Sequence, residues 1–341
     1  MFEHHLEKNL NLFAFSELEI HTLVINSQVL RKNPLKDTAR RVNPILVPKK
    51  KSREWPVVFV LAGFTGNGGN YFNIKSYEAN AVQTLASAIQ RKKAPMAIYV
   101  FVDAWTYWGG SQFINSRGCG AYEDYIIKEL VPAIKKNFSV SSNPALWAVT
   151  GGSSGGYGAL HLASQFPQHF GVCAAIAPDS FFPMSLLPEL YSAWPYLQKW
   201  GGVVGVKKAM EQGKILGRRE SHTLLNAIGM GLCYAANARG EVEWPFNENG
   251  ELLTNVWKKW LKKDPLQFLL TRKKSLTKVK HFYLDVGLYD QFHLQYGSRQ
   301  IYKILKSLSA SVSYTEFSGN HFDIGDRRID MWKWLNGLLS E

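Results

Sequence analysis

ALWAVTGGSSGGYGAL, residues 145–160, is the stretch of this sequence that decides the expected fold. Apolar and β-branched residues come first and predict a buried strand, and the small residues at the end predict the start of a helix. Two pairs of glycines enclose two serines between these elements. A sharp turn of this kind, with little side chain around a hydroxyl, is typical of a serine held in a strained strand-to-helix junction.

Strand and helix patterns alternate on both sides of this turn. Extended apolar patterns cover residues 21–30, 40–48, 55–64, 96–104, 145–151, 171–179, 281–287 and 311–319. Amphipathic helical patterns cover residues 80–93, 122–138, 156–166, 297–310 and 327–339. This alternation predicts an α/β fold with a mostly parallel sheet and helices on both of its faces. Functional residues are then expected beyond the carboxyl ends of the strands.

The alternation of strand and helix patterns is interrupted at two places. We expect residues 1–40 to form an N-terminal extension with a short helix and the first strand, and residues 41–341 to form the main domain. Residues 180–274 are helical and rich in Trp and Tyr, with glycine-rich joints such as KWGGVVGVKKAMEQG. This segment is interpreted as a helical cap inserted over the strand ends rather than as an independent domain.

Composition excludes several classes of protein. The 341 residues are 46% hydrophobic and 13% aromatic, which is typical of a globular chain, and no apolar run approaches the length of about 20 residues that spans a bilayer. The net charge of +13 comes from short, scattered basic clusters, so we expect no nucleic-acid partner and no stable membrane insertion. Three widely spaced cysteines predict buried free thiols and no metal site. The first residues, MFEHHLEKNLNLF, lack a signal-peptide pattern, so a cytoplasmic location is expected, and the oligomeric state stays open.

The glycine-flanked serine pattern G-x-S-x-G fits in two frames. One frame makes Ser153 the nucleophile and the other makes it Ser154. We favour Ser153, because the preceding strand delivers it directly at the turn and the N–H of Ser154 is then free to bind an oxyanion. A phosphate-binding loop is the alternative interpretation, but the stretch lacks the Lys-Ser/Thr pair and the G-x-G-x-x-G pattern of such loops.

A serine nucleophile needs a base, and hydrolases of this pattern place it last along the chain. Four histidines follow the turn at a distance. His321 lies in a loop of small polar residues directly after the last strand pattern, where such a base is expected, and His293 is the second choice. His281 opens a strand pattern, and His222 lies within the cap segment.

The base in turn needs a carboxylate that fixes its tautomer. Asp290 follows the strand pattern at residues 281–287 by a short loop, at the same sheet edge as the serine, and is our choice. Asp285 lies inside that strand, while Asp323 and Asp326 stand too close to the histidine along the chain.

Two further features belong to the expected site. The glycine-rich loop after residues 55–64 places the N–H of Phe64 as a second oxyanion donor, unless this is an ordinary connection. Trp105, Trp108 and Tyr157 are candidate substrate-binding residues, although core packing explains any one of them equally well.

With these residues chosen, the sequence resembles the esterase branch of the α/β-hydrolases, which includes esterase D (S-formylglutathione hydrolase), enterochelin-esterase-like proteins and mycolyltransferases. The resemblance runs from about residue 42 to the end of the chain. It is carried by PVVFVLAGFTGNGGNY, NSRGCGAYEDYIIKELVPAI, TGGSSGGYGAL, WPFNENGELLTNVWKKWLKKDPL, DVGLYDQFHL and GNHF. It implies an α/β-hydrolase fold and places the family's nucleophile, acid and base on Ser153, Asp290 and His321.

The sequence also departs from this family at two positions. Ala62-Gly63 stands where relatives often have His-Gly, and Ser154 stands where a bulkier residue often follows the nucleophile. The WPFNENGELLTNVWKKWLKKDPL segment is more similar to the enterochelin-esterase-like proteins than to the glutathione-thioester enzymes.

The function that follows is a serine hydrolase of carboxylic esters that works through an acyl-enzyme. The resemblance implies no metal or organic cofactor, and the expected partner is a small-molecule ester. An acyltransferase of the mycolyltransferase type and a thioesterase such as S-formylglutathione hydrolase are the alternatives that share the site. A non-catalytic binding protein that keeps the fold is the rival from another class.

Overall fold

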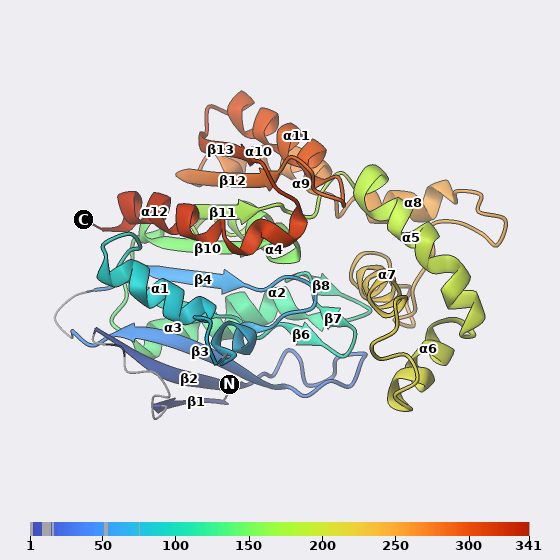
Figure 1. The fold of residues 1–341 in the computed structure, drawn as a ribbon, viewed down its shortest axis with the longest axis horizontal. Coiled ribbons are helices and arrows are strands. Elements are labelled where there is room, and N and C mark those ends of the chain that lie inside the picture. The colour runs from blue at the N-terminus through green and yellow to red at the C-terminus, as the bar shows by residue number, and fades with distance from the viewer. Residues whose placement is uncertain (1–2, 9–14, 16, 51–53, 75, 341) are drawn as a thin grey trace.

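A computed structural model describes residues 3–8, 15, 17–50, 54–74 and 76–340. Its centre is a nine-stranded sheet in the order β1-β2-β3-β5-β4-β10-β11-β12-β13 (Figure 1). The strands of this sheet are β1 (Glu3–Lys8), β2 (Leu18–Asn26), β3 (Arg40–Pro48), β4 (Val57–Leu61), β5 (Ile98–Phe101), β10 (Trp147–Gly152), β11 (Val172–Ile176), β12 (His281–Gly287) and β13 (Ser311–Phe317). Two small hairpin sheets pair β6 (Trp105–Thr106) with β7 (Gly109–Gly110), and β8 (Asn115–Ser116) with β9 (Gly120–Ala121).

The sheet is mostly parallel, as the alternation of patterns predicts. β5, β4, β10, β11, β12 and β13 run parallel to one another, while β1, β2 and β3 pair antiparallel and β3 also pairs antiparallel with β5. β10 lies in the interior, with Val149 level with Phe59 of β4 and Cys173 of β11. Because residues 147–151 are buried and residues 148–151 are paired on both sides, β10 holds the turn after it in a fixed place.

Helices cover both faces of the sheet. Side chains of β4 alternate between the two faces, so Phe59 packs into one apolar cluster with α4 and α3, and Val58 packs into another with α1 and α12. The helices of these layers are α1 (Ala81–Gln90), α2 (Tyr122–Asp124), α3 (Val131–Asn137), α4 (Ser154–Gln165), α11 (Leu294–Ser307) and α12 (Arg328–Leu339). Short helical segments complete them: η1 (Gly68–Phe72), η2 (Tyr125–Leu130), η3 (Pro144–Leu146) and η4 (His321–Gly325).

Helices α5 to α10 occupy the chain between β11 and β12. They are α5 (Phe182–Lys199), α6 (Gly202–Glu211), α7 (Ser221–Tyr234), α8 (Thr254–Leu261), α9 (Pro265–Thr271) and α10 (Lys273–Leu276). Figure 1 shows α5 to α8 beyond the carboxyl end of β4, whereas α9 and α10 pack against α4. We call residues 180–274 the cap. The division of the chain at residue 40 and the limits of the cap stay predictions.

The expectation of a helix near the N-terminus is wrong for residues 3–8. These residues form β1, which pairs antiparallel with β2 from Glu3–Asn26 to Lys8–His21. The edge of β2 offers unpaired backbone groups, and pairing with β1 satisfies them. A six-residue pattern cannot reveal such a tertiary contact. The rest of the expected helix, residues 9–14, lies outside the described part of the chain.

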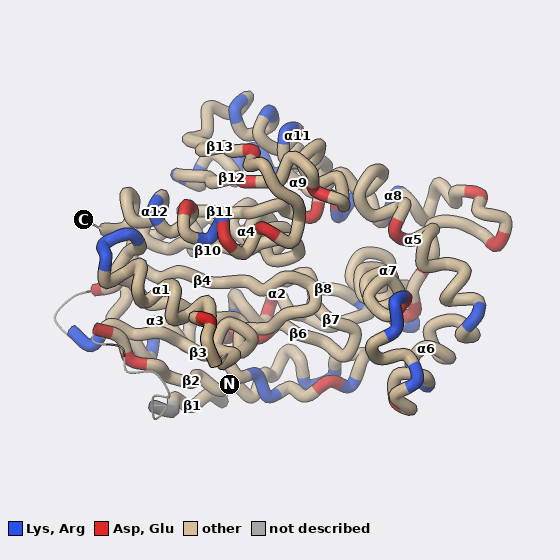
Figure 2. Tube along the Cα trace, in the orientation of Figure 1, with Lys and Arg blue, Asp and Glu red and all other residues tan. Residues whose placement is uncertain are grey.

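Surface charge and cysteine burial agree with the sequence patterns. Figure 2 shows Lys and Arg scattered over many loops and helix faces, with Asp and Glu between them. Cys119, Cys173 and Cys233 are buried free thiols. Within the described part of the chain, no helix is long and apolar enough to cross a bilayer.

Candidate active site

The turn between β10 and α4 presents Ser153 on a strained backbone. Ser153 has φ 57° and ψ −125°, in the left-handed half of conformational space that side chains other than glycine rarely adopt. The conformation projects the hydroxyl out of the end of β10, while Ser154 already begins the helix. Ser153 is half-buried and Ser154 is buried, so the backbone agrees with the frame that makes Ser153 the candidate nucleophile.

Two glycines permit this turn by close packing. A Cβ on Gly155 would lie 2.3 Å from the carbonyl oxygen of Leu61, and a Cβ on Gly151 would lie 2.4 Å from the carbonyl carbon of Gly155. These contacts are all with backbone, which cannot swing aside as a flexible side chain can. A side chain at Gly155 would push α4 away from β4, and one at Gly151 would push α4 away from β10, so either would move Ser153.

The structure brings Ser153, His321 and Asp290 together. His321 Nε2 lies 3.0 Å from Ser153 Oγ, and His321 Nδ1 lies 2.7 Å from Asp290 Oδ2. Ser153, Asp290 and His321 follow β10, β12 and β13, and parallel strands present their carboxyl ends at one sheet edge. This arrangement can pass a proton from the hydroxyl to the ring.

The Asp290 carboxylate is held so that it orients the ring. Its side chain is fully buried, and Oδ1 accepts a hydrogen bond of 2.9 Å from the N–H of Phe292. The N–H of His321 donates to Gln291 Oε1 at 2.9 Å, and the edge of the imidazole meets the Phe292 ring. With Nδ1 against the carboxylate, Nε2 is the nitrogen that faces the hydroxyl.

The other candidate acids and bases lie elsewhere. His293 is exposed, with φ 59°, just before α11, and His281 contacts Ser311 Oγ at the opposite end of β12. Asp285 is buried inside β12 and forms an ion pair with Arg327, in which Nε and Oδ2 are 2.8 Å apart. The structure therefore does not bring these three residues to Ser153.

Phe64 and Ser154, the two residues expected to supply N–H donors, both lie beside Ser153. The loop after β4 passes close to the turn, because a Cβ on Gly63 would lie 3.9 Å from Ser153 Cβ. Phe64 and Ser154 both line the cavity beside Ser153. Among the described residues, neither the Phe64 nor the Ser154 N–H has a protein acceptor. Both are therefore available to a ligand oxygen.

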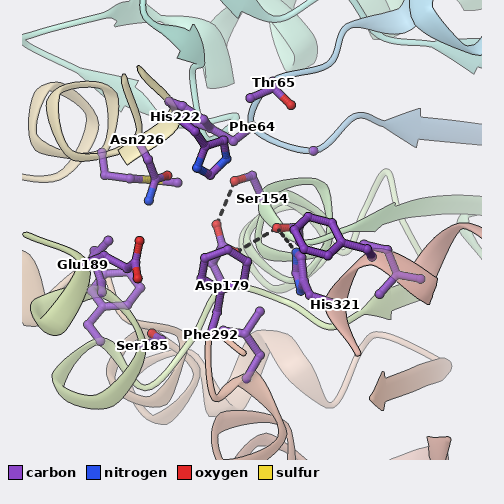
Figure 3. A pocket seen from close by; sticks show the side chains of 18 of the residues that line it. Phe64, Thr65, Ser154, Asp179, Ser185, Glu189, His222, Asn226, Phe292 and His321 are labelled. Atoms are coloured by element: carbon purple, nitrogen blue, oxygen red, sulfur yellow. Dashed lines mark hydrogen bonds between the residues drawn. The ribbon is translucent and has the colours of Figure 1, made fainter. Parts of the chain in front are cut away.

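A cavity of about 330 Å³ opens over Ser153 and His321. The sheet edge supplies one wall, and the cap supplies the opposite wall through α5 and α7 (Figure 3). The cap side is mixed in character, with apolar Leu186 and Met230 next to polar Glu189 and Asn226. A small organic molecule fits a space of this size and lining.

Trp105, Trp108 and Tyr157 do not line this cavity. Trp108 and Tyr157 are buried in the main apolar cluster, and Trp105 lies on β6 with 42% of its surface exposed. The structure thus assigns two of the three aromatics to core packing, which was the alternative interpretation of each.

Sequence reasoning missed Asp179, which stands beside the serine. Oδ1 of Asp179 accepts a hydrogen bond of 3.2 Å from Ser153 Oγ, while Oδ2 accepts one of 2.7 Å from Ser154 Oγ and one of 3.1 Å from Gln112 Nε2. Figure 3 shows Asp179 between Ser154 and Glu189 of the cap wall. The available signal was its position at the end of the 171–179 strand pattern, next to the pattern that carries Ser153.

The surroundings of Asp179 are buried and polar. Burial raises the pKa of the Asp179 carboxyl, and its three hydrogen bonds and the nearby His321 oppose that rise. Gln112 is fully buried, with φ 55°. Burial also raises the pKa of Glu189 on the cap wall, and the nearby His222 opposes that rise. The cavity therefore holds two carboxyl groups in poorly solvated places.

Comparisons with known proteins identify a family and a fold. The family model described as "Putative esterase" matches residues 37–321, while no curated protein sequence matches the chain significantly. A ferulic acid esterase structure superposes with a TM-score of 0.61 at 16% identity, over 94% of this chain and 99% of that chain. An S-formylglutathione hydrolase from Agrobacterium tumefaciens superposes with a TM-score of 0.57 at 16% identity, over 98% of this chain and 100% of that chain.

The enterobactin esterase FES from Shigella flexneri is also similar in fold. Its TM-score is 0.52 at 16% identity, over 93% of this chain and 58% of that chain. Identities this low establish the fold, and the family model establishes the relationship. The chain belongs to this family of esterases and has the α/β-hydrolase fold that the resemblance implies.

Proposed function

We propose that this protein is a serine hydrolase of carboxylic esters that works through an acyl-enzyme, with Ser153 as nucleophile, His321 as base and Asp290 as the acid that orients it. The observation that carries the proposal is the continuous chain of contacts from Asp290 Oδ2 to His321 and on to Ser153 Oγ, 2.7 Å and 3.0 Å long. Membership of an esterase family supports the same chemistry.

The first half-reaction transfers the acyl group to the serine. Ser153 Oγ bonds to the ester carbonyl carbon while its proton passes to His321 Nε2, and the carbonyl oxygen becomes an oxyanion. The imidazolium then gives that proton to the alcohol oxygen as the bond between it and the carbonyl carbon breaks. The alcohol leaves, and the acyl group stays on Ser153.

The second half-reaction reverses these roles with water. His321 removes a proton from water as the water oxygen bonds to the acyl carbon, and it then protonates Ser153 Oγ as the acid departs. The buried Asp290 carboxylate stabilises the imidazolium in both halves.

The oxyanion needs donors that are in place before it forms. The free N–H groups of Phe64 and Ser154 beside Ser153 meet that need, and losing one such donor typically costs about 3–4 kcal/mol of barrier lowering. Both belong to backbone held by β4 and α4, so little reorganisation is required. The cap supplies the wall against which the substrate rests.

The test is hydrolysis of p-nitrophenyl acetate and p-nitrophenyl butyrate by the wild type and by Ser153→Ala. We expect turnover by the wild type and a loss of about 10³-fold or more in the variant, since binding and the oxyanion donors alone leave only a residual rate. Full turnover by Ser153→Ala would overturn the mechanism.

The same acyl-enzyme would serve an acyltransferase or a thioesterase. Repeating the assay with added alcohol or sugar acceptors, and with thioesters, separates these outcomes. A transfer product that exceeds the acid product would replace the hydrolase assignment with a transferase one.

A further inference from the structure

We infer that Asp179 Oδ1 accepts a hydrogen bond from the acyl group of the substrate, so that the preferred esters carry a hydroxyl or ammonium group on the carbon next to the carbonyl. The inference deepens the proposed function and rests on it. The hydrogen bonds of the Asp179 carboxylate differ before and after Ser153 is acylated.

In the free protein the two oxygens of Asp179 are occupied unequally. Oδ2 accepts from both Ser154 Oγ and Gln112 Nε2, at 2.7 Å and 3.1 Å. Oδ1 accepts from Ser153 Oγ at 3.2 Å. The one hydrogen of Ser153 Oγ can point to Oδ1 or to His321 Nε2, 3.0 Å away, but not to both. The described residues provide Oδ1 with no other donor, so Oδ1 has a hydrogen bond only while the hydroxyl is turned away from the base.

Acylation removes that donor. The oxygen of an acylated Ser153 is an ester oxygen, which has lone pairs and no hydrogen, and it would face the lone pairs of Asp179 Oδ1 across about 3 Å. An acceptor left without a donor in a poorly solvated site destabilises the state that contains it. The acyl-enzyme is therefore favoured when something else donates to Oδ1.

Only the acyl group stays covalently beside the serine at this stage, because the alcohol has already left. A donor atom on the carbon next to the carbonyl is three bonds from the serine oxygen, which places it about 2.7–3.6 Å away by standard bond lengths. Asp179 Oδ1 lies 3.2 Å from the same oxygen, so the two can meet without strain.

The site keeps Asp179 fixed in this role. Gln112, which bonds Oδ2, is fully buried, and its Nε2 also lies 2.9 Å from the hydroxyl of Tyr234 on the cap. Figure 3 shows Ser185 and Asn226 on the cap side of the same cavity, so the acyl group enters a polar region. A purely alkyl chain gains no hydrogen bond there.

The test compares three methyl esters that differ in one group on that carbon: 2-methylpropanoate with a methyl group, lactate with a hydroxyl and 2-aminopropanoate with an ammonium. The measured quantity is kcat/KM of each donor ester divided by that of 2-methylpropanoate. Dividing this ratio by the same ratio for hydroxide-catalysed hydrolysis removes the intrinsic reactivity of the esters. We expect the corrected wild-type ratio to exceed about tenfold for at least one donor ester.

Asp179→Asn is the matched variant. The amide oxygen can take the place of Oδ2 and keep the bonds from Ser154 and Gln112, which turns the amide NH₂ toward Ser153. A donor then stands where the acceptor was. We expect the corrected ratio of the donor esters to fall at least tenfold in this variant.

Glu189→Gln controls for the general attraction of a cation by an acidic cavity. It should change the lactate ratio less than about twofold, because lactate is uncharged and the inference places its hydroxyl on Asp179. An equal fall in both variants, or a corrected wild-type ratio near one, would overturn the inference. A raised corrected ratio for 2-aminopropanoate alone would identify the preferred donor as an ammonium group. A raised ratio for both 2-aminopropanoate and lactate would show that either kind of donor is preferred.

Labelling with a fluorophosphonate separates the two possible failures. If the wild type labels at Ser153 and hydrolyses all three esters without preference, only the inference fails. If it neither labels nor hydrolyses, the proposed function fails with it. Labelling of Asp179→Asn shows that its site is intact, and the corrected wild-type ratio decides the matter without that variant.

Discussion

Replacing Asp290 by Asn is expected to stop turnover by changing the tautomer of His321. Asp290 Oδ1 accepts the N–H of Phe292 at 2.9 Å, so in the variant the amide oxygen keeps that place and the NH₂ turns to His321 Nδ1. A donor facing Nδ1 forces that nitrogen to accept, and the ring proton moves to Nε2. Nε2 faces Ser153 Oγ and, once protonated, cannot remove its hydrogen.

The expected loss is large because nothing else can replace the carboxylate. The Asp290 side chain is fully buried, so water cannot reach Nδ1 in its place. A wrong tautomer in a triad of this kind lowers kcat about 10⁴-fold, which corresponds to about 5 kcal/mol of transition-state stabilisation.

The assay is kcat for p-nitrophenyl butyrate under saturating conditions, with circular dichroism to show that each variant is folded. Asp285→Asn is the matched control, because Asp285 is a buried carboxylate of the neighbouring β12 strand that contacts Tyr283 and Arg327 instead of the histidine. Its kcat should stay within about threefold of the wild type. The reasoning is refuted if Asp290→Asn keeps kcat within tenfold, or if Asp285→Asn loses as much.

Three further changes test the surroundings of the nucleophile. Gly155→Ala puts a Cβ 2.3 Å from the Leu61 carbonyl oxygen, so urea unfolding should show a free energy of unfolding lower by about 1–3 kcal/mol. Gly337→Ala, in open space on α12, should raise that free energy by about 0.5–1 kcal/mol, and equal effects would contradict the packing argument. Ser154→Ala removes a hydroxyl and keeps the backbone N–H, so kcat should fall less than about tenfold. A fall in kcat as large as the one expected for Ser153→Ala would instead indicate that Ser154 is the nucleophile. Burial raises the pKa of Asp179 above its ordinary value of 3.8, so the folded state binds this proton more tightly than the unfolded chain, and ionisation costs stability as the pH rises through the folded-state pKa. The melting temperature of Asp179→Asn should therefore match that of the wild type at low pH and exceed it increasingly toward pH 7. A melting temperature that falls relative to the wild type as the pH rises would contradict the raised pKa.

Much of the site was predictable because its residues follow strands. Ser153, Asp290 and His321 each come directly after a strand pattern, and in a parallel sheet those positions meet at one edge. The glycines around Ser153 carried a second signal, because a tight turn and close helix packing require them. Both signals are local in the chain, which is why sequence alone could place these three side chains.

The remaining features depend on tertiary contacts that no local pattern encodes. Tyr157 lies one turn after Ser153, yet α4 is buried along almost its whole length, so the ring packs against Phe182 and Tyr234 instead of lining the cavity. The end of the 171–179 strand pattern gave a weak signal for Asp179, but its contacts with Ser154 and with Gln112, from a loop far along the chain, follow only from the fold.

The most direct test is to find where the acyl group resides during turnover. Wild-type protein is mixed with p-nitrophenyl butyrate, quenched with acid within the first turnover, digested and sequenced by tandem mass spectrometry. A butyryl group on Ser153, lost on longer incubation in water and missing from Ser153→Ala, is the predicted result. Hydrolysis at the full rate with no acyl group on Ser153, or with the group on Ser154 or another residue, would contradict it.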